Sequence, residues 1–135
     1  MDVVALIASI PRAEELLVTS LPSVLSQTRH PDAVFIVQDN YDLTEEQAKK
    51  AKAILSPLPV YLLSNSGAHG AAGSWNTGIK YISQRYSDCY VAILDDDDSW
   101  LPNHLQLCLS SSNQSSSDLV LSGIEAYKAG KRVEC

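Results

Sequence analysis

Five short apolar runs, separated by stretches with helical spacing, constrain the fold of this chain more than any other feature. The runs are continuous and rich in β-branched residues, which is typical of strands buried on both faces of a parallel sheet. They cover residues 3–8, 33–37, 60–63, 90–94 and 118–124. This alternation predicts an α/β fold: a mostly parallel sheet with helices on both faces.

Four helices are expected between these strands. The first is interrupted at Pro22, which should kink it or restart it with Pro22 in the first turn. Thr44 and Gln47 form a capping box at the start of the second. The third carries an apolar stripe: Trp75, Ile79, Ile82 and Tyr86. The fourth is expected to hold Pro102 in its first turn and to end before a polar loop, SSSNQSSS, at 110–117.

Polar residues gather directly after the first four of these strands. They occupy positions 9–12, 38–40, 64–76 and 95–98. In parallel sheets of this kind, ligands bind outside the carboxyl ends of the strands, which lie at one edge. We therefore expect one ligand site built from four strand ends.

The fourth strand runs into four consecutive aspartates, Asp95 to Asp98. Adjacent carboxylates repel one another and resist burial, so a counter-ion is needed unless the run is a solvated turn before a helix. We favour a divalent cation, because the run follows a buried strand and returns at once to the apolar SWLP. Mg²⁺ and Mn²⁺ prefer oxygen ligands. Side chains along an extended segment point alternately to opposite sides, which places Asp95 and Asp97 on one side and Asp96 and Asp98 on the other.

Three glycines, Gly67, Gly70 and Gly73, precede the third predicted helix. Glycine lets the backbone approach a ligand, and helix N-termini favour anions. The spacing matches neither the dinucleotide fingerprint nor the P-loop, so a flexible turn is the alternative interpretation. In that case Ser74 or Asn76 would simply cap the helix.

Composition limits the classes of partner. A chain of 135 residues fits one domain, and 10 Lys+Arg against 16 Asp+Glu give a net charge of -6. That balance argues against nucleic acid and anionic membrane as partners. The sequence shows no signal peptide, no membrane span and no metal-ligand spacing among its three cysteines. We therefore expect a soluble, cytoplasmic protein.

Five segments, in a recognisable order, carry a family resemblance: VVALIASIPR, SLPSVLSQT, VFIVQDN, GAAGSWNTGI and YVAILDDDDSWLPNHL. With them the chain resembles the N-terminal, nucleotide-sugar-binding half of family 2 glycosyltransferases. The last segment is the most specific, with an apolar strand, D-x-D and W-x-P-x-x-L. The resemblance implies a Rossmann-like GT-A fold, with residues 1–135 as a single donor-binding domain. It also implies metal-dependent transfer of a sugar from a nucleotide diphosphate sugar, UDP-sugar favoured, to an unknown acceptor.

The resemblance also implies roles for individual residues. Ser9 and Pro11 would line the nucleoside pocket, and Asp39 would accept a hydrogen bond from the base. An acidic acceptor suits the imide N–H of uracil or thymine and could also suit guanine. Asp97 would be the direct ligand of Mn²⁺ or Mg²⁺, and Asp95 or Asp96 would reach the ribose or the metal's waters. The metal would bridge the two phosphates and offset charge on the leaving diphosphate.

One departure from the family pattern concerns the phosphate contact. Many members carry A-R-N where this chain has Ser74, Trp75 and Asn76. The arginine would contact a phosphate, which Trp75 cannot do, and its stripe indicates a core position. Arg12 or Lys80 could replace that contact, although we expect each to be a solvated surface charge.

A second departure concerns the end of the chain. The family continues well past the D-x-D into an acceptor site and an acidic catalytic base. We therefore expect a partial domain that lacks this region. No catalytic residue is assigned in this chain, and the role of the base is not carried over to Glu125 or Glu134. An exposed apolar face at the missing half would favour self-association.

Two other functions stay open. A non-catalytic nucleotide-binding or interaction module on the same fold would fit the missing base and Trp75. A nucleotidyltransferase also uses a parallel sheet and a carboxylate-bound metal. However, such an enzyme would want a glycine-rich, basic loop after the first strand, where this chain has SIPRAEE.

Overall fold

A parallel sheet of four strands forms the centre of the computed structural model, which describes residues 1–123, 126–128 and 131–133. The strands are β1 (Asp2–Ser9), β2 (Ala33–Gln38), β3 (Val60–Ser64) and β4 (Cys89–Asp95). Their order is β3-β2-β1-β4, and each neighbouring pair is parallel. The first four predicted strands and their parallel arrangement are confirmed.

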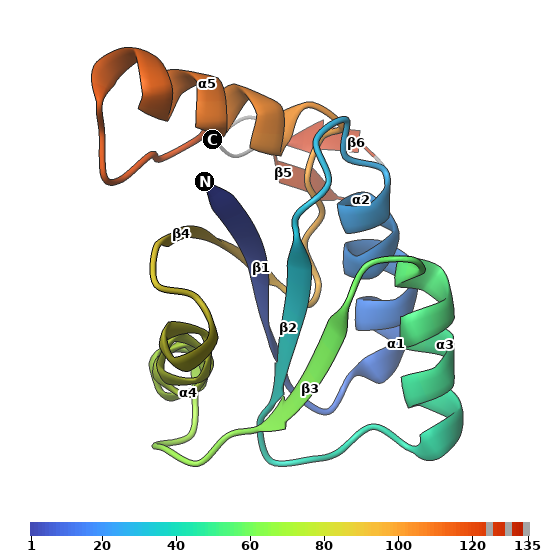
Figure 1. Cartoon of the computed structure of the whole chain (residues 1–135). Helices are drawn as coiled ribbons and strands as arrows, with labels where there is room; N and C mark the ends of the chain where they lie inside the picture. Colours follow the sequence, from blue (N-terminus) through green and yellow to red (C-terminus); the bar gives the residue numbers. More distant parts are fainter. Residues whose placement is uncertain (124–125, 129–130, 134–135) are drawn as a thin grey trace.

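Helices cover both faces of this sheet, as predicted (Figure 1). The helical elements are α1 (Ala13–Glu15), the π-helical η1 (Leu16–Ser20), α2 (Leu21–Leu25), α3 (Glu45–Leu55), α4 (Ala71–Arg85) and α5 (His104–Ser115). The consecutive α1, η1 and α2 lie with α3 on one face, and α4 lies on the other. Within the described part of the chain, no helix combines the length and apolar character that crossing a bilayer requires.

Alternate side chains of the central strands build two cores. One faces α1 to α3 and includes Ala5, Ile7, Val34 and Ile36. The other faces α4 and includes Val4, Leu6, Phe35 and Val37. Because β1 and β2 bury side chains on both faces, their sequences are continuous apolar runs instead of alternating ones.

Two details of the predicted helices are confirmed. Pro22 lies in the first turn of α2, directly after the π-helical turn η1. Proline has no N–H, so the regular bonding pattern cannot continue through it. At the start of α3, the Gln47 N–H donates to Thr44 Oγ1 at 3.1 Å, and the Thr44 N–H donates to Gln47 Oε1 at 3.0 Å. These two bonds form the capping box.

Two predictions about the fourth helix are wrong. Pro102 precedes α5, which begins at His104 with Asn103 as its N-cap residue. The helix also continues through most of the stretch 110–117 that was expected to be a loop. Ser112 explains part of this extension, because its buried hydroxyl donates to the Ser117 carbonyl at 2.7 Å and also contacts the Tyr90 hydroxyl. Packing against β4 thus outweighs the polar composition.

The prediction of a fifth parallel strand at 118–124 is also wrong for the residues of this range that the structure describes. Residues 118–123 form no strand, and Ile124 lies outside the described residues, as do Glu125 and Glu134. Leu119 and Leu121 in this segment are 75% and 85% exposed, so they contribute nothing to the core. The strands β5 (Ala126–Lys128) and β6 (Lys131–Val133) pair with each other antiparallel, in a separate sheet. Among the described strands, β4 therefore has a partner only along the edge facing β1.

Two positions of α4, Gly73 in its first turn and Gly78 in its middle, pack so closely that only glycine fits without rearrangement. A Cβ atom at Gly78 would lie 2.3 Å from Leu6 Cδ1, inside the core on the α4 face. A Cβ atom at Gly73 would lie 1.7 Å from the backbone oxygen of Ala68. Gly73 therefore lets the loop between β3 and α4 lie directly on the first turn of the helix.

We predict that Gly73→Ala lowers the free energy of unfolding by about 1–3 kcal/mol, the usual cost of overpacking. The Ala68 carbonyl belongs to the backbone and cannot rotate away, so the loop has to move. Gly67→Ala in the same loop is the matched control, because its Cβ would meet no atom closer than 3.5 Å. Urea denaturation should show that control within about 0.5 kcal/mol of the parent. Equal stability of the two variants would contradict the prediction.

Candidate functional site

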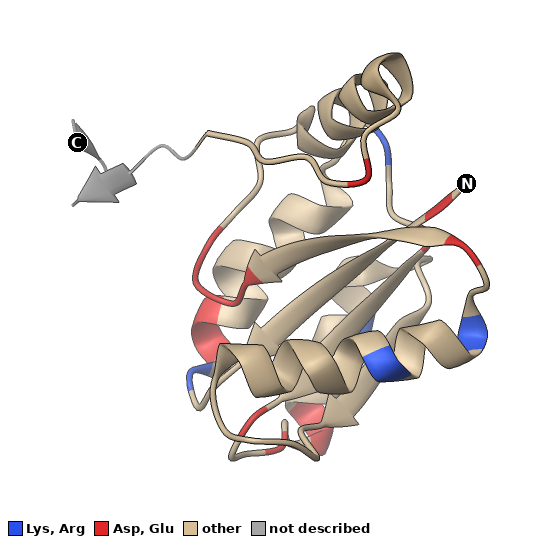
Figure 2. Cartoon of the chain, turned by 90° about the vertical axis from the view of Figure 1, so that its left-hand side faces the viewer, with Lys and Arg blue, Asp and Glu red and all other residues tan. Residues whose placement is uncertain are grey.

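The four strand ends lie at one edge of the sheet, as the sequence predicts. In the strand register, Ser9 lies beside Gln38, Gln38 beside Ser64, and Ala8 beside Asp95. The Asp39 N–H donates to the Ser9 carbonyl at 2.8 Å and continues this alignment past the end of β2. Figure 2 shows the acidic segment that begins at the carboxyl end of β4 and continues into the following loop.

The four aspartates after β4 have unequal environments. The Asp98 N–H donates to the Asp95 carbonyl at 3.1 Å and closes a turn. Asp95, Asp97 and Asp98 are exposed, and each offers a carboxylate oxygen within 4.8 Å of the others. Asp96 is buried, with 1% exposure. The expected separation of Asp95 and Asp97 from Asp96 is confirmed, but the turn brings Asp98 to the side of the first two.

Asp96 is held by the segment that follows β1. Its carboxylate accepts hydrogen bonds from the Ile10 N–H at 3.0 Å and from Arg12 Nε at 2.8 Å, and a second guanidinium nitrogen lies 2.7 Å away. Another Arg12 nitrogen lies 3.3 Å from Asp97. Arg12 is thus a counter-ion of the acidic turn, although a solvated charge was expected. The predicted contact of Asp96 with ribose or metal-bound water stays a prediction.

Electrostatic repulsion remains among the exposed carboxylates. Partial loss of solvation, followed by the negative charges of Asp97 and Asp95, raises the pKa of Asp98, and Arg12 only partly counteracts this. For Arg12 itself, the hydrogen bond to Asp96 raises the pKa above its ordinary value. A cation beside these carboxylates would relieve the repulsion. Three carboxylate oxygens form a donor set that fits Mg²⁺ or Mn²⁺.

Asp39, at the end of β2, is buried and accepts three hydrogen bonds from the loop before α4. Its Oδ1 accepts from Asn65 Nδ2 at 3.0 Å and from His69 Nδ1 at 2.9 Å, and its Oδ2 accepts from the Gly70 N–H at 2.8 Å. These bonds, with that from Asn65 contributing most, lower the pKa of Asp39 to about 2. Gly70, whose N–H makes this bond, has a φ of 109°, a backbone conformation that favours glycine.

Ser9 and Pro11, predicted to line a nucleoside pocket, differ in exposure. Ser9 is buried, and its Oγ lies 2.5 Å from the Tyr41 hydroxyl. Pro11 is exposed in the bend between β1 and α1. Burial raises the pKa of Tyr41, and the nearby charge of Asp96 acts in the same direction. Tyr41 was missed in the sequence, where its position two residues after Asp39 was the available signal.

The two positions considered for a phosphate contact in α4 are now placed. Trp75 packs against the core on the α4 face, as its stripe predicts, and its Nε1 has no hydrogen-bond partner in the described structure. Lys80 is exposed on the helix. Asn65 and His69 were missed as partners of Asp39, because the sequence distinguishes them only by their place after the third strand.

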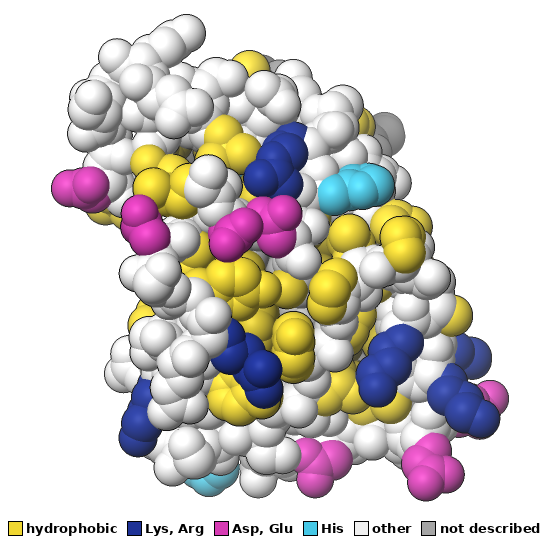
Figure 3. Space-filling model, in the orientation of Figure 1, with side chains coloured by type: hydrophobic (Ala, Val, Ile, Leu, Met, Phe, Trp, Pro, Cys, Tyr) yellow, Lys and Arg dark blue, Asp and Glu magenta, His cyan; other side chains and the backbone are white. Residues whose placement is uncertain are grey.

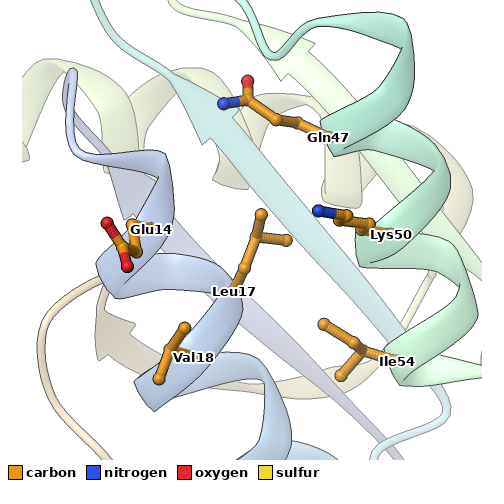
Figure 4. Close-up of a pocket in the computed structure, with 6 residues that line it drawn as sticks. All are labelled: Glu14, Leu17, Val18, Gln47, Lys50 and Ile54. Carbon is orange, nitrogen blue, oxygen red and sulfur yellow. The ribbon is translucent and has the colours of Figure 1, made fainter.

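A separate surface hollow lies between η1 and α3. It has a volume of about 420 Å³ and is lined by Glu14, Leu17, Val18, Gln47, Lys50 and Ile54 (Figure 4). Figure 3 shows hydrophobic side chains reaching the surface among basic ones on the side of the molecule seen in Figure 1. No residue of the predicted site lines this hollow, so it is distinct from the strand-end site.

Comparisons with known proteins identify the family of this chain. Residues 6–134 match the family described as Glycosyl transferase family 2. A curated relative is the UDP-Glc:alpha-D-GlcNAc-diphosphoundecaprenol beta-1,3-glucosyltransferase WfgD of Escherichia coli, which is 34% identical over 98 residues. That alignment covers 73% of this chain and 36% of WfgD.

A solved structure supports the fold independently. The crystal structure of TarS from S. aureus superposes with a TM-score of 0.61 at 23% sequence identity, over 87% of this chain and 20% of TarS. At that identity the likeness concerns the GT-A fold alone. This chain spans about a third of WfgD and a fifth of TarS. With the family match over nearly its whole length, the chain belongs to glycosyl transferase family 2.

Proposed function

We propose that this chain binds the nucleotide diphosphate sugar and the divalent metal of a glycosyltransferase that transfers the sugar to an acceptor. One observation carries the proposal: three exposed carboxylates converge within 4.8 Å at the sheet edge that also holds Asp39. The family supports sugar transfer, and the name of WfgD includes a UDP-sugar donor.

The metal would be held by Asp97 and Asp95, with Asp98 as a third oxygen donor brought near by the turn. When bound, a divalent cation offsets the negative charge that develops on a leaving diphosphate. Asp96 supports this arrangement, because its buried bonds to Ile10 and Arg12 hold the turn against the β1 end. A role of Asp95 or Asp96 toward the ribose is part of the same proposal.

The nucleoside would lie beside Ser9, Pro11 and Asp39. Asp39 is ionised at neutral pH, because its three donors stabilise the charged form. An ionised carboxylate only accepts hydrogen bonds, which is what recognition of a base N–H requires. Ser9 and the Asp39 backbone are bonded directly, so both groups are fixed on the sheet edge.

We predict that Asp97→Asn weakens Mn²⁺-dependent binding of UDP by more than about tenfold, at least the loss seen when residues supporting a metal site are removed. The matched control is Asp88→Asn, which removes a carboxylate just before β4, at the opposite edge of the sheet. Titrations of UDP, GDP and dTDP with and without Mn²⁺, followed by tryptophan fluorescence, measure the effect. A folded parent chain that binds none of them in a metal-dependent way would refute the proposed function.

We predict that the stabilising effect of the ionised Asp39 depends on pH. Its pKa falls from 3.8 to about 2 on folding, so this stabilisation is complete above about pH 4 and is lost as the pH falls through about 2. Urea titrations of the parent and Asp39→Asn should therefore show the parent more stable at pH 6, with a difference that shrinks toward pH 2. A difference that stays constant over this range would contradict the assignment.

We also propose that the chain self-associates along β4. The strand has no partner on its outer edge among the described residues, and Ile93 on it is 43% exposed. Unpaired apolar edges promote strand pairing between copies, and a lysine placed there opposes it. Ile93→Lys should therefore shift a concentration-dependent dimer to monomer in size-exclusion chromatography with light scattering. A parent chain that stays monomeric at every concentration would contradict this.

A further inference from the structure

We propose that Asn65 and His69 determine which base the site accepts, by leaving Asp39 a single free acceptor position. This inference rests on the proposed function, in which Asp39 receives an N–H of the nucleotide base. The selected bases are those that present one N–H between acceptors, such as uracil. Guanine, which presents two adjacent donors, is disfavoured.

The argument begins with the acceptor capacity of Asp39. A carboxylate offers about four acceptor positions, two on each oxygen. Asn65 and His69 use both positions on Oδ1, and the Gly70 N–H uses one on Oδ2. One position on Oδ2 remains. The Asp39 side chain keeps 6% of its surface exposed, which is consistent with a single narrow approach.

The orientation of Asn65 is fixed by its other hydrogen bonds. Its Nδ2 also donates to the Ala68 carbonyl at 2.9 Å. Its Oδ1 accepts from the Gly67 N–H at 2.9 Å and from Thr77 Oγ1 at 2.8 Å. With both donors and both acceptor positions used, the amide cannot flip without losing bonds. Asn65 therefore keeps its position on Asp39 Oδ1 occupied.

His69 differs from Asn65 because it can be removed without dismantling the loop. Its side chain is 79% exposed, and within the part of the chain that the structure describes it makes one polar contact, the 2.9 Å bond to Asp39. An ionised carboxylate carries no hydrogen, so His69 Nδ1 donates in this bond. Loss of the ring would free one position on Oδ1. Asp39 would then offer one position on each oxygen, the pattern that two adjacent N–H groups require.

The bases differ in what they present to such an acceptor. Uracil has one imide N–H flanked by two carbonyl oxygens, and hypoxanthine has one N–H beside a carbonyl. Guanine adds an amino group next to that N–H, so one of its donors would lose its water partner without gaining another. A donor left unpaired in a desolvated site costs affinity, on the order of tenfold or more. Comparing inosine diphosphate with GDP isolates this amino group at constant purine size.

The experiment measures dissociation constants of UDP, inosine diphosphate and GDP in Mn²⁺ by isothermal titration calorimetry. For the parent chain, we expect inosine diphosphate to bind roughly tenfold more tightly than GDP. In His69→Ala this preference should disappear or reverse, with UDP affinity within about threefold of the parent. His69→Gln, whose amide can donate to Oδ1, should restore the preference. His30→Ala, which removes another exposed imidazole just before β2 at the opposite sheet edge, is the matched control.

Three results would overturn the inference while leaving the proposed function intact. The first is metal-dependent GDP binding by the parent as tight as that of inosine diphosphate. The second is an unchanged preference in His69→Ala. The third is that the parent and His69→Ala both bind UDP but bind neither purine nucleotide. The size of the pocket would then determine which base binds. Failure of a folded parent chain to bind any of the three would instead refute the proposed function, and this inference with it.

Discussion

The pairing of Arg12 with Asp96 is the interaction on which the arrangement of the site depends. Four adjacent carboxylates at the end of one strand would repel one another and resist packing. Turning Asp96 inward, onto the guanidinium and the Ile10 N–H, removes one of them from this cluster. The other three can then face solvent together. The same contact ties the carboxyl end of β4 to the segment after β1, so two strand ends behave as one structural unit.

A second carboxylate organises the remaining strand ends. Asp39 receives its donors from the loop between β3 and α4, and Gly73 lets that loop lie against the first turn of α4. The glycine-rich stretch thus allows the loop to pack closely, and the N–H of Gly70 in it donates a hydrogen bond to the Asp39 carboxylate. The buried side of α4 is anchored by Gly78 against Leu6 in the core. Close backbone packing and the hydrogen bonds to the Asp39 carboxylate together therefore shape this half of the edge.

Much of this could be predicted from the sequence, because the relevant signals are local. Continuous apolar runs identified four parallel strands, of which β1 and β2 are buried and β3 and β4 are mostly half-buried. The positions after these strands identified the sheet edge. Alternation separated Asp96 from Asp95 and Asp97, but it predicted neither the burial of Asp96 nor its partner, since Arg12 lies 84 positions away. The same limit applies to Asn65 and His69, whose contacts with Asp39 depend on how the loop folds back. The end of α5 was misjudged because Ser112 is buried and contacts the Tyr90 hydroxyl, which composition does not reveal.

The 3.3 Å approach of Arg12 to Asp97 has a thermodynamic consequence. A cation that binds Asp97 would be repelled by the nearby Arg12 guanidinium. This repulsion, or the free energy needed to move Arg12 away, would lower the affinity for the cation. Conversely, whatever draws Arg12 away from Asp97 makes that carboxylate a better ligand, and by reciprocity a bound cation loosens Arg12 from the turn. If the proposed cation binds, its occupancy and the position of Arg12 would therefore be linked equilibria. A negatively charged molecule that attracts both the cation and the guanidinium would strengthen this linkage.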